Sequence, residues 1–200
     1  MPKTQVQLRV VASNDHLSAR ERLARSFRNT MMEHLRAHTE GTNVNPNTLL
    51  TTDYLNHFSE IIMLLELVPS APSQFAAELA EWEHESYEEH FTHSGFRDKE
   101  LAIVGYRNAP EEVRRAFDSS VADLEQEMVL LLKQVQDRIA EGDASGLSEL
   151  CSESVPRLQG LVGVISGIVN GEVPETDDEE QATSAEKTTD AQSAVDALFD

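Results

Sequence analysis

The sequence contains only one cysteine, Cys151, which excludes a disulfide bond within the chain. Apolar runs are short, and even residues 158–169 are interrupted by polar residues and glycines. A membrane-spanning helix needs roughly 20 predominantly apolar residues, so no span is predicted. Because the first four residues show no secretory or transit pattern, we expect a cytoplasmic protein without membrane contact.

Common catalytic motifs are also missing. The chain has no Gly-x-Ser-x-Gly turn and no glycine-rich phosphate loop. Cys151 lies between Leu150 and Val155 and resembles a small core residue more than a nucleophile. We therefore expect no resident cofactor and favour a role without catalysis.

Positive charge is scarce, with 16 Lys and Arg against 36 Asp and Glu. Residues 40–96 contain ten acidic residues and no Lys or Arg, whereas residues 1–39 contain seven of the 16 basic ones. Such a surface repels a phosphate backbone, so nucleic acid is not an expected ligand. The acidic surface has three open interpretations: it keeps the protein soluble, it pairs with a basic surface such as the arginine-rich first helix, or it mimics nucleic acid.

The N-terminal region predicts an arm followed by a helix. Residues 1–16 alternate apolar and polar side chains around Val6 and Val10, which is typical of an extended arm. Ser18 and Glu21 have the spacing of a capping box that begins a helix ending near His38. Four apolar residues of this helix recur at helical spacing: Leu23, Phe27, Met31 and Leu35.

Three shorter helices are predicted in the middle of the chain. One begins at Thr52-Asp53 and ends at Pro69, and a second begins at Ser70–Ser73 and runs through Trp82 toward His90. A third extends from a cap at Asp98 to about Tyr106. The apolar faces of these helices can pack against and cover the apolar face of a longer helical hairpin.

Residues 110–170 predict a long antiparallel helical hairpin. Pro110, Glu111 and Glu112 form a strong helix start, and apolar residues then recur every three or four positions to Ile139. Residues 142–146 break the helix before a returning one, which Pro156 is expected to kink. We therefore predict an all-α helical bundle over residues 17–171, with homodimerisation as a second way to cover the hairpin.

The alternative function is metal binding by a glutamate and histidine cluster. Glu81 and His84 have the Glu-x-x-His spacing of carboxylate-bridged di-iron bundles, and His57 with Glu60 offers further ligands. A di-iron site needs two such motifs and two more glutamates, and only one motif is present. Two interpretations of these residues therefore remain: a divalent metal ion bound by His57, Glu60, Glu81 and His84, or a solvated acidic face without a metal ion.

The C-terminal segment is a candidate binding peptide. Residues 172–190 are acidic, rich in Ser and Thr and poor in core-forming residues, which is typical of a disordered linker. Residues 191–200 again contain large apolar residues, interspersed with polar ones, and so form a short amphipathic segment. Such a segment on a tether usually binds a groove on another protein. The partner-binding candidates are Gln192, Val195, Asp196, Leu198 and Phe199.

These five residues resemble the CheY-binding segments of CheZ-type chemotaxis phosphatases and of the flagellar switch protein FliM. Both segments have the form Ser/Asp-Gln-x-x-Ile/Val-Asp-x-Leu-Leu, from which this chain departs at Ala191 and at Phe199. The resemblance covers about nine residues of 200. CheZ-type phosphatases also place a long dimerising hairpin, a linker and a binding peptide in this order. The resemblance implies a CheY-like receiver domain as partner.

The catalytic signature of that family is absent. It places an acidic residue four positions before a glutamine on the hairpin. None of the hairpin glutamines here has an acidic residue at that position. The residues found four positions before Gln126, Gln134, Gln136 and Gln159 are Ala122, Leu130, Leu132 and Val155, respectively. Asp53 and Asn56 form an acid and amide pair such as other response-regulator phosphatases use to orient a water molecule. Asp53 is equally explained as a helix-start residue. The leading hypothesis is a regulatory or adaptor protein, with aspartyl-phosphate hydrolysis at Asp53 and Asn56 as its sharper form.

Overall fold

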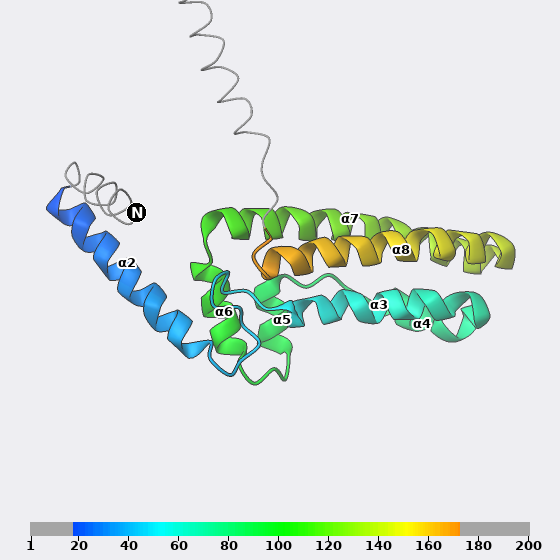
Figure 1. Cartoon of the computed structure of the whole chain (residues 1–200). Coiled ribbons are helices and arrows are strands. Elements are labelled where there is room, and N and C mark those ends of the chain that lie inside the picture. Colours follow the sequence, from blue (N-terminus) through cyan, green and yellow to red (C-terminus); the bar gives the residue numbers. More distant parts are fainter. Residues whose placement is uncertain (1–17, 173–200) are drawn as a thin grey trace, which may run out of the picture.

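A computed structural model describes residues 18–172, and every regular element in this range is a helix (Figure 1). The all-α prediction is confirmed. The predicted arm (residues 1–16) and terminal peptide (residues 191–200) lie outside the described residues, as does the predicted linker apart from Glu172.

The predicted hairpin is formed by the two longest helices, α7 (Glu111–Glu141) and α8 (Ala144–Val169), which lie side by side (Figure 1). The turn is tighter than the sequence indicates, because Gly142 alone adopts the left-handed conformation, with φ of 70°. Asp143 then caps α8 by accepting a 2.9 Å hydrogen bond from the amide of Gly146. Pro156 lies inside α8, which continues through it.

Two helices from the middle of the chain cover one face of the hairpin. A 3-10 turn, η1 (Thr52–Leu55), leads into α3 (Asn56–Leu67), which packs against α8. A second 3-10 turn, η2 (Val68–Ser70), reverses the chain into α4 (Pro72–Glu81), which packs against α7. The buried side chains of α3 (Phe58, Ile61, Ile62 and Leu65) belong to the same core cluster as those of the hairpin.

Two short helices close one end of this bundle. They are α5 (Tyr87–His93) and α6 (Lys99–Asn108), and aromatic rings fill the space between them, η1 and α7. Phe117 of α7 contacts the rings of Tyr54, Tyr87 and Tyr106 at centroid distances of 5.9, 5.6 and 6.4 Å. This aromatic cluster fixes where α5 sits, and α5 carries part of the candidate site.

The first helix, α2 (Ala19–His38), begins at the predicted capping box and projects away from the bundle (Figure 1). Its only buried residue is Leu35, near the end that contacts α6. The capping prediction is confirmed, since Ser18 and Glu21 bond to each other's backbone amides at 2.7 and 3.3 Å. The other apolar residues of this helix do not reach the bundle core.

The prediction that one helix runs through Trp82 toward His90 is wrong. The helix α4 ends at Glu81, because the backbone of Trp82 is extended, with ψ of 124°. A new helix begins after Ser86, whose side chain and that of Glu89 form a second capping box. The Ser-x-x-Glu signal was in the sequence, but it lay inside a stretch whose glutamates favour an uninterrupted helix.

Candidate functional site

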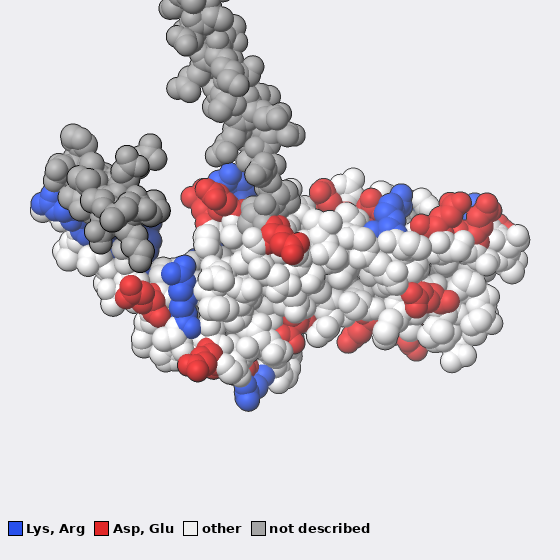
Figure 2. Space-filling view, in the orientation of Figure 1, with Lys and Arg blue, Asp and Glu red and all other residues white. Residues whose placement is uncertain are grey.

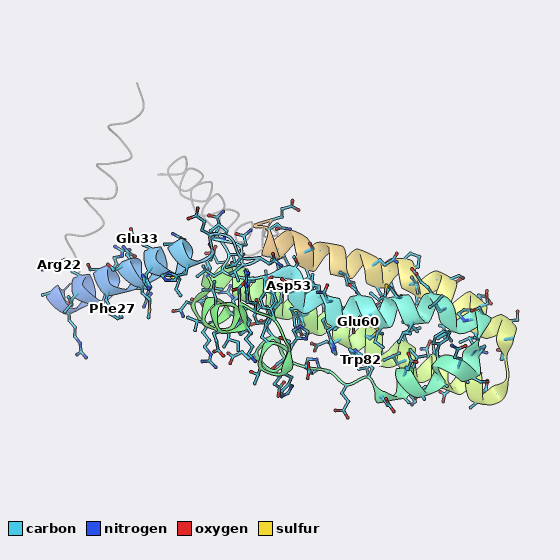
Figure 3. The ribbon with its side chains drawn as sticks, turned by 90° about the horizontal axis from the view of Figure 1, so that it is seen from below. Arg22, Phe27, Glu33, Asp53, Glu60 and Trp82 are labelled. Carbon is cyan, nitrogen blue, oxygen red and sulfur yellow. The ribbon has the colours of Figure 1, made fainter. Side chains whose placement is uncertain are left out.

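The structure brings two histidines and a glutamate together beside the bundle. His57 comes from the first turn of α3, Glu85 from the segment between α4 and α5, and His90 from α5. One nitrogen or oxygen from each of the three side chains lies within 4.8 Å of the others, and all three residues are half-buried. Figure 3 views this side of the molecule and labels Glu60 on α3 and Trp82 after α4. We call this group the His57 cluster.

Aromatic rings hold both histidines in place. The indole of Trp82 stacks on the His57 ring, with centroids 5.2 Å apart and an angle of 22°. The His90 ring meets Tyr54 edge to face at 5.5 Å, and Tyr54 is almost fully buried. Nε2 of His57 is buried and has no hydrogen-bond partner among the described residues.

The carboxylate of Glu85 lies between two histidines of α5. Its Oε1 is 2.8 Å from Nδ1 of His93, and its Oε2 is 3.7 Å from Nδ1 of His90. The first distance is that of a hydrogen bond, and the second is too long for one. His93 therefore fixes the orientation of Glu85 and leaves Oε2 available toward His90.

Burial is the main influence on the two histidines of the cluster. It lowers the pKa of His57, and the nearby His90 lowers it further, while Glu85, a hydrogen bond with the backbone of Glu83, and Glu60 oppose the shift. Burial also lowers the pKa of His90, against the attraction of Glu85, Glu60 and Asp53. Both imidazoles are consequently neutral at pH 7, the form in which histidine binds a metal ion.

The predicted metal set comes together only in part. His57 belongs to the cluster, and Glu60 is close enough to influence both of its histidines. Glu81 is the exposed last residue of α4 and His84 follows the helix, so the pair does not share a helical face. His84 instead lies 2.8 Å from Oε1 of Glu125 on α7. The Glu-x-x-His expectation fails because it assumed one continuous helix.

Glu85 and His90 are the members of the cluster that the predicted set did not contain. His90 lies three positions before His93 in the sequence, but no spacing rule points to Glu85. Glu85 is brought to His57 by the segment 82–86 between α4 and α5. Proximity between residues so far apart in the sequence leaves no periodic pattern in it.

The residues of the predicted catalytic pair lie where η1 runs directly into α3, and the backbone amide of Asn56 donates a hydrogen bond to the carbonyl of Asp53. Asp53 lies in η1, and its carboxylate accepts hydrogen bonds from the Thr51 hydroxyl at 2.6 Å and from the Asn43 amide at 3.1 Å. Asn56 is the exposed first residue of α3. The carboxylate of Asp53 thus joins the loop after α2 to η1, which accounts for this residue as a structural one.

A second candidate surface is the exposed apolar stripe of α2. Leu23, Phe27 and Met31 recur at four-residue intervals and are 73, 68 and 41 % exposed. They span about 12 Å of the helix at 1.5 Å per residue. The same helix is basic, because it contains five Arg and only two Glu. These residues are Arg20, Arg22, Arg25, Arg28, Arg36, Glu21 and Glu33. We call Leu23, Phe27 and Met31 the α2 stripe.

A third feature is a cleft of about 530 Å³ between α7 and α8. Its lining mixes apolar and acidic side chains, and an ion pair of 2.7 Å joins Arg157 and Glu127 across it. Figure 2 shows further Asp and Glu over the hairpin. The lining residues are Asp123, Gln126, Glu127, Leu130, Leu131, Gln134, Ser154, Arg157 and Leu161.

The predicted partner-binding residues, Gln192 to Phe199, lie outside the described residues. In the described range, no helix is long and apolar enough to cross a membrane. Comparison of the chain with protein-family models, with curated proteins and with solved structures finds no match in any of the three.

Proposed function

We propose that this chain is a regulatory or adaptor protein that acts by binding other proteins. The observation that carries the proposal is the α2 stripe, on a helix that projects from the bundle. Burying a large apolar side chain contributes about 1.5–3 kcal/mol, so three exposed ones on a single helical face favour a protein partner.

The first partner in this proposal is a CheY-like receiver domain, bound by Gln192, Val195, Asp196, Leu198 and Phe199. The end of α8 lies beside the loop after α2, where the Thr48 hydroxyl donates a 2.6 Å hydrogen bond to the carbonyl of Val169. A tethered peptide keeps its partner at high effective concentration near the bundle. The proposed compartment is the cytoplasm, in keeping with the single unpaired cysteine.

The proposed role is binding without hydrolysis of the aspartyl phosphate. The carboxylate of Asp53 already accepts hydrogen bonds from Thr51 and from Asn43 in the loop after α2. Each hydrogen bond to a carboxylate contributes about 1.5–3 kcal/mol, so freeing Asp53 for catalysis would destabilise the loop.

The second partner is another copy of this chain, whose α7–α8 cleft would receive α2. The cleft offers Leu130 and Leu161 to apolar side chains and Asp123 to arginines. An amphipathic helix that lays its apolar face into a groove is a common recognition mode, and here the acidic residues of the cleft would face the arginines of α2. In this arrangement the α2 stripe is buried by the dimer.

Calorimetric titration tests the receiver domain as partner. Phosphorylated and unphosphorylated CheY-type regulators are titrated into the full chain and into a 1–186 truncation. We expect micromolar binding that the truncation abolishes and that Leu198→Asp weakens at least tenfold, while Ser193→Asp serves as a charge-matched control. Equal binding by both chains, or no binding, overturns this assignment.

Sedimentation velocity of the full chain tests the dimer. We expect a concentration-dependent dimer that Phe27→Glu dissociates and Asn29→Glu leaves intact, because Asn29 is exposed elsewhere on α2. A monomer at all concentrations, or equal effects of both variants, rejects the second copy as occupant of the cleft.

A further inference from the structure

Beyond protein binding, we propose that His57, Glu85 and His90 bind one divalent transition-metal ion of the zinc class. The fourth coordination position would be open to water. This ligand set replaces the predicted one, of which it retains only His57.

The first argument is the spacing of the ligand atoms. Zinc binds nitrogen and oxygen ligands at about 2.0–2.2 Å in a tetrahedron, whose ligand atoms are then about 3.3 Å apart. His90 Nδ1 and Glu85 Oε2 are 3.7 Å apart, and all three ligand atoms lie within 4.8 Å of one another. Metal binding would require rotations of Glu85 and His90 that bring the three ligand atoms to tetrahedral spacing.

A second, independent argument is the unpaired nitrogen of His57. Its Nε2 is buried without a hydrogen-bond partner, although buried polar groups in folded proteins are nearly always paired. The stacked indole of Trp82 holds the ring, so this nitrogen cannot easily turn to solvent. A metal ion would satisfy it.

The surroundings of the cluster resemble the outer shell of a metal site. Ligating carboxylates in such sites are themselves hydrogen-bonded, and Glu85 has this support from His93 at 2.8 Å. Glu60 and Asp53 add negative charge close to His90. These acidic groups would compensate the charge of the cation.

The donor set also selects the class of metal. Ca²⁺ and Mg²⁺ prefer oxygen ligands only, and two imidazoles out of three donors disfavour them. Two histidines and one carboxylate suit Zn²⁺, and also Co²⁺, which reports its coordination through visible absorption.

The test is titration of Zn²⁺ and Co²⁺ into the full chain after chelator treatment, followed by calorimetry and by visible spectroscopy. We expect one ion per chain and a tetrahedral Co²⁺ spectrum without a thiolate charge-transfer band. Glu85→Gln and His90→Gln each weaken binding at least tenfold. His38→Gln is the matched control, because His34 and His38 form an exposed histidine pair on α2, with rings 4.2 Å apart.

Results on the wild-type chain and on its variants can each overturn the proposal. Absence of saturable binding, or an octahedral Co²⁺ spectrum, rejects the site, and so does binding that His38→Gln weakens as much as His90→Gln. Because half-buried variants can unfold, circular dichroism accompanies each titration. NMR signals of the His57 and His90 rings that do not move when Zn²⁺ is added to wild type count equally against it.

Discussion

At the scale of single residues, Leu49 is the one non-glycine residue within 18–172 whose φ is positive. Its φ is 62°, in the left-handed region that non-glycine residues rarely adopt, while its side chain is fully buried. Two backbone hydrogen bonds of 2.7 and 2.8 Å join Leu49 and Leu50 to Asn45 and stabilise this conformation. The turned carbonyl of Leu49 then packs against the backbone of α6 at Gly105.

The first prediction concerns that contact. A Cβ at Gly105 would collide with the carbonyl oxygen of Leu49, so Gly105→Ala should lower the free energy of unfolding by about 1–3 kcal/mol. The control is Gly160→Ala, because Gly160 is exposed in α8 with nothing within 4 Å of its Cβ position. This control should stabilise the protein by about 0.5–1 kcal/mol. Urea denaturation of the two variants measures both effects, and destabilisation of equal size would contradict the packing argument.

The second prediction concerns pH. Burial lowers the pKa of His57 and of His90, so the unfolded chain binds protons that the folded chain does not. Stability is therefore fully present above the unfolded histidine pKa of about 6.5 and declines as the pH falls below it toward the lowered folded values. The His57→Gln/His90→Gln double variant should lose stability less steeply than wild type between pH 7 and pH 5. Parallel denaturation curves at several pH values check this, and identical slopes would contradict it.

At the scale of elements, α2 and α7 have apolar residues at the same helical spacing, but those of α2 are exposed and those of α7 are buried. Val113, Phe117 and Val121 of α7 are at most 9 % exposed, whereas Leu23 and Phe27 of α2 are about two-thirds exposed or more. The spacing determines which face of a helix is apolar, but only the surrounding elements determine whether that face is covered.

The third prediction compares two capping boxes. Ser86→Ala should lower the global stability by about 1 kcal/mol, because it begins α5, whose Tyr87 and Phe91 are buried. Ser18→Ala should instead fray only the first turn of α2, since that turn contacts no core. Hydrogen exchange of residues 19–22 and global urea denaturation separate the two effects. A global loss of equal size in both variants would contradict the projecting position of α2.

At the scale of the whole molecule, two contacts organise the fold: α3 and α4 on one face of the hairpin, and the aromatic cluster at its end (Figure 1). Phe117 is at the centre of the second contact, because it extends from α7 into the rings of Tyr54, Tyr87 and Tyr106. The positions of α5 and of the His57 cluster depend on this packing.

The fourth prediction tests that dependence. Phe117→Ala should lower the free energy of unfolding by about 3–5 kcal/mol, because the side chain is 1 % exposed and its loss leaves a cavity. Val129→Ala, on the same helix but 55 % exposed, should change it by less than about 0.5 kcal/mol. Thermal and chemical denaturation measure the difference, and similar losses would show that the aromatic cluster does not organise the fold.

The elements of this protein were largely predictable from local sequence. The capping box at Ser18, the helix start at Pro110 and the glycine after α7 act over a few residues, and each marks a boundary that the structure confirms. The break between α4 and α5 was missed because the glutamate-rich stretch around Trp82 has high helical propensity throughout. A cap within such a stretch competes with propensity, and tertiary packing of Tyr87 and Phe91 decides the outcome.

The sequence by itself thus determined the helical class, the long hairpin and the faces that each helix presents, because caps and periodicity act within one or two turns. Only the tertiary structure decided that α2 stands apart with its apolar stripe exposed, that Asp53 bonds to Asn43 in the loop after α2, and that Glu85 joins His57 and His90. These arrangements join residues from separate elements, and no local spacing rule encodes the contacts between them.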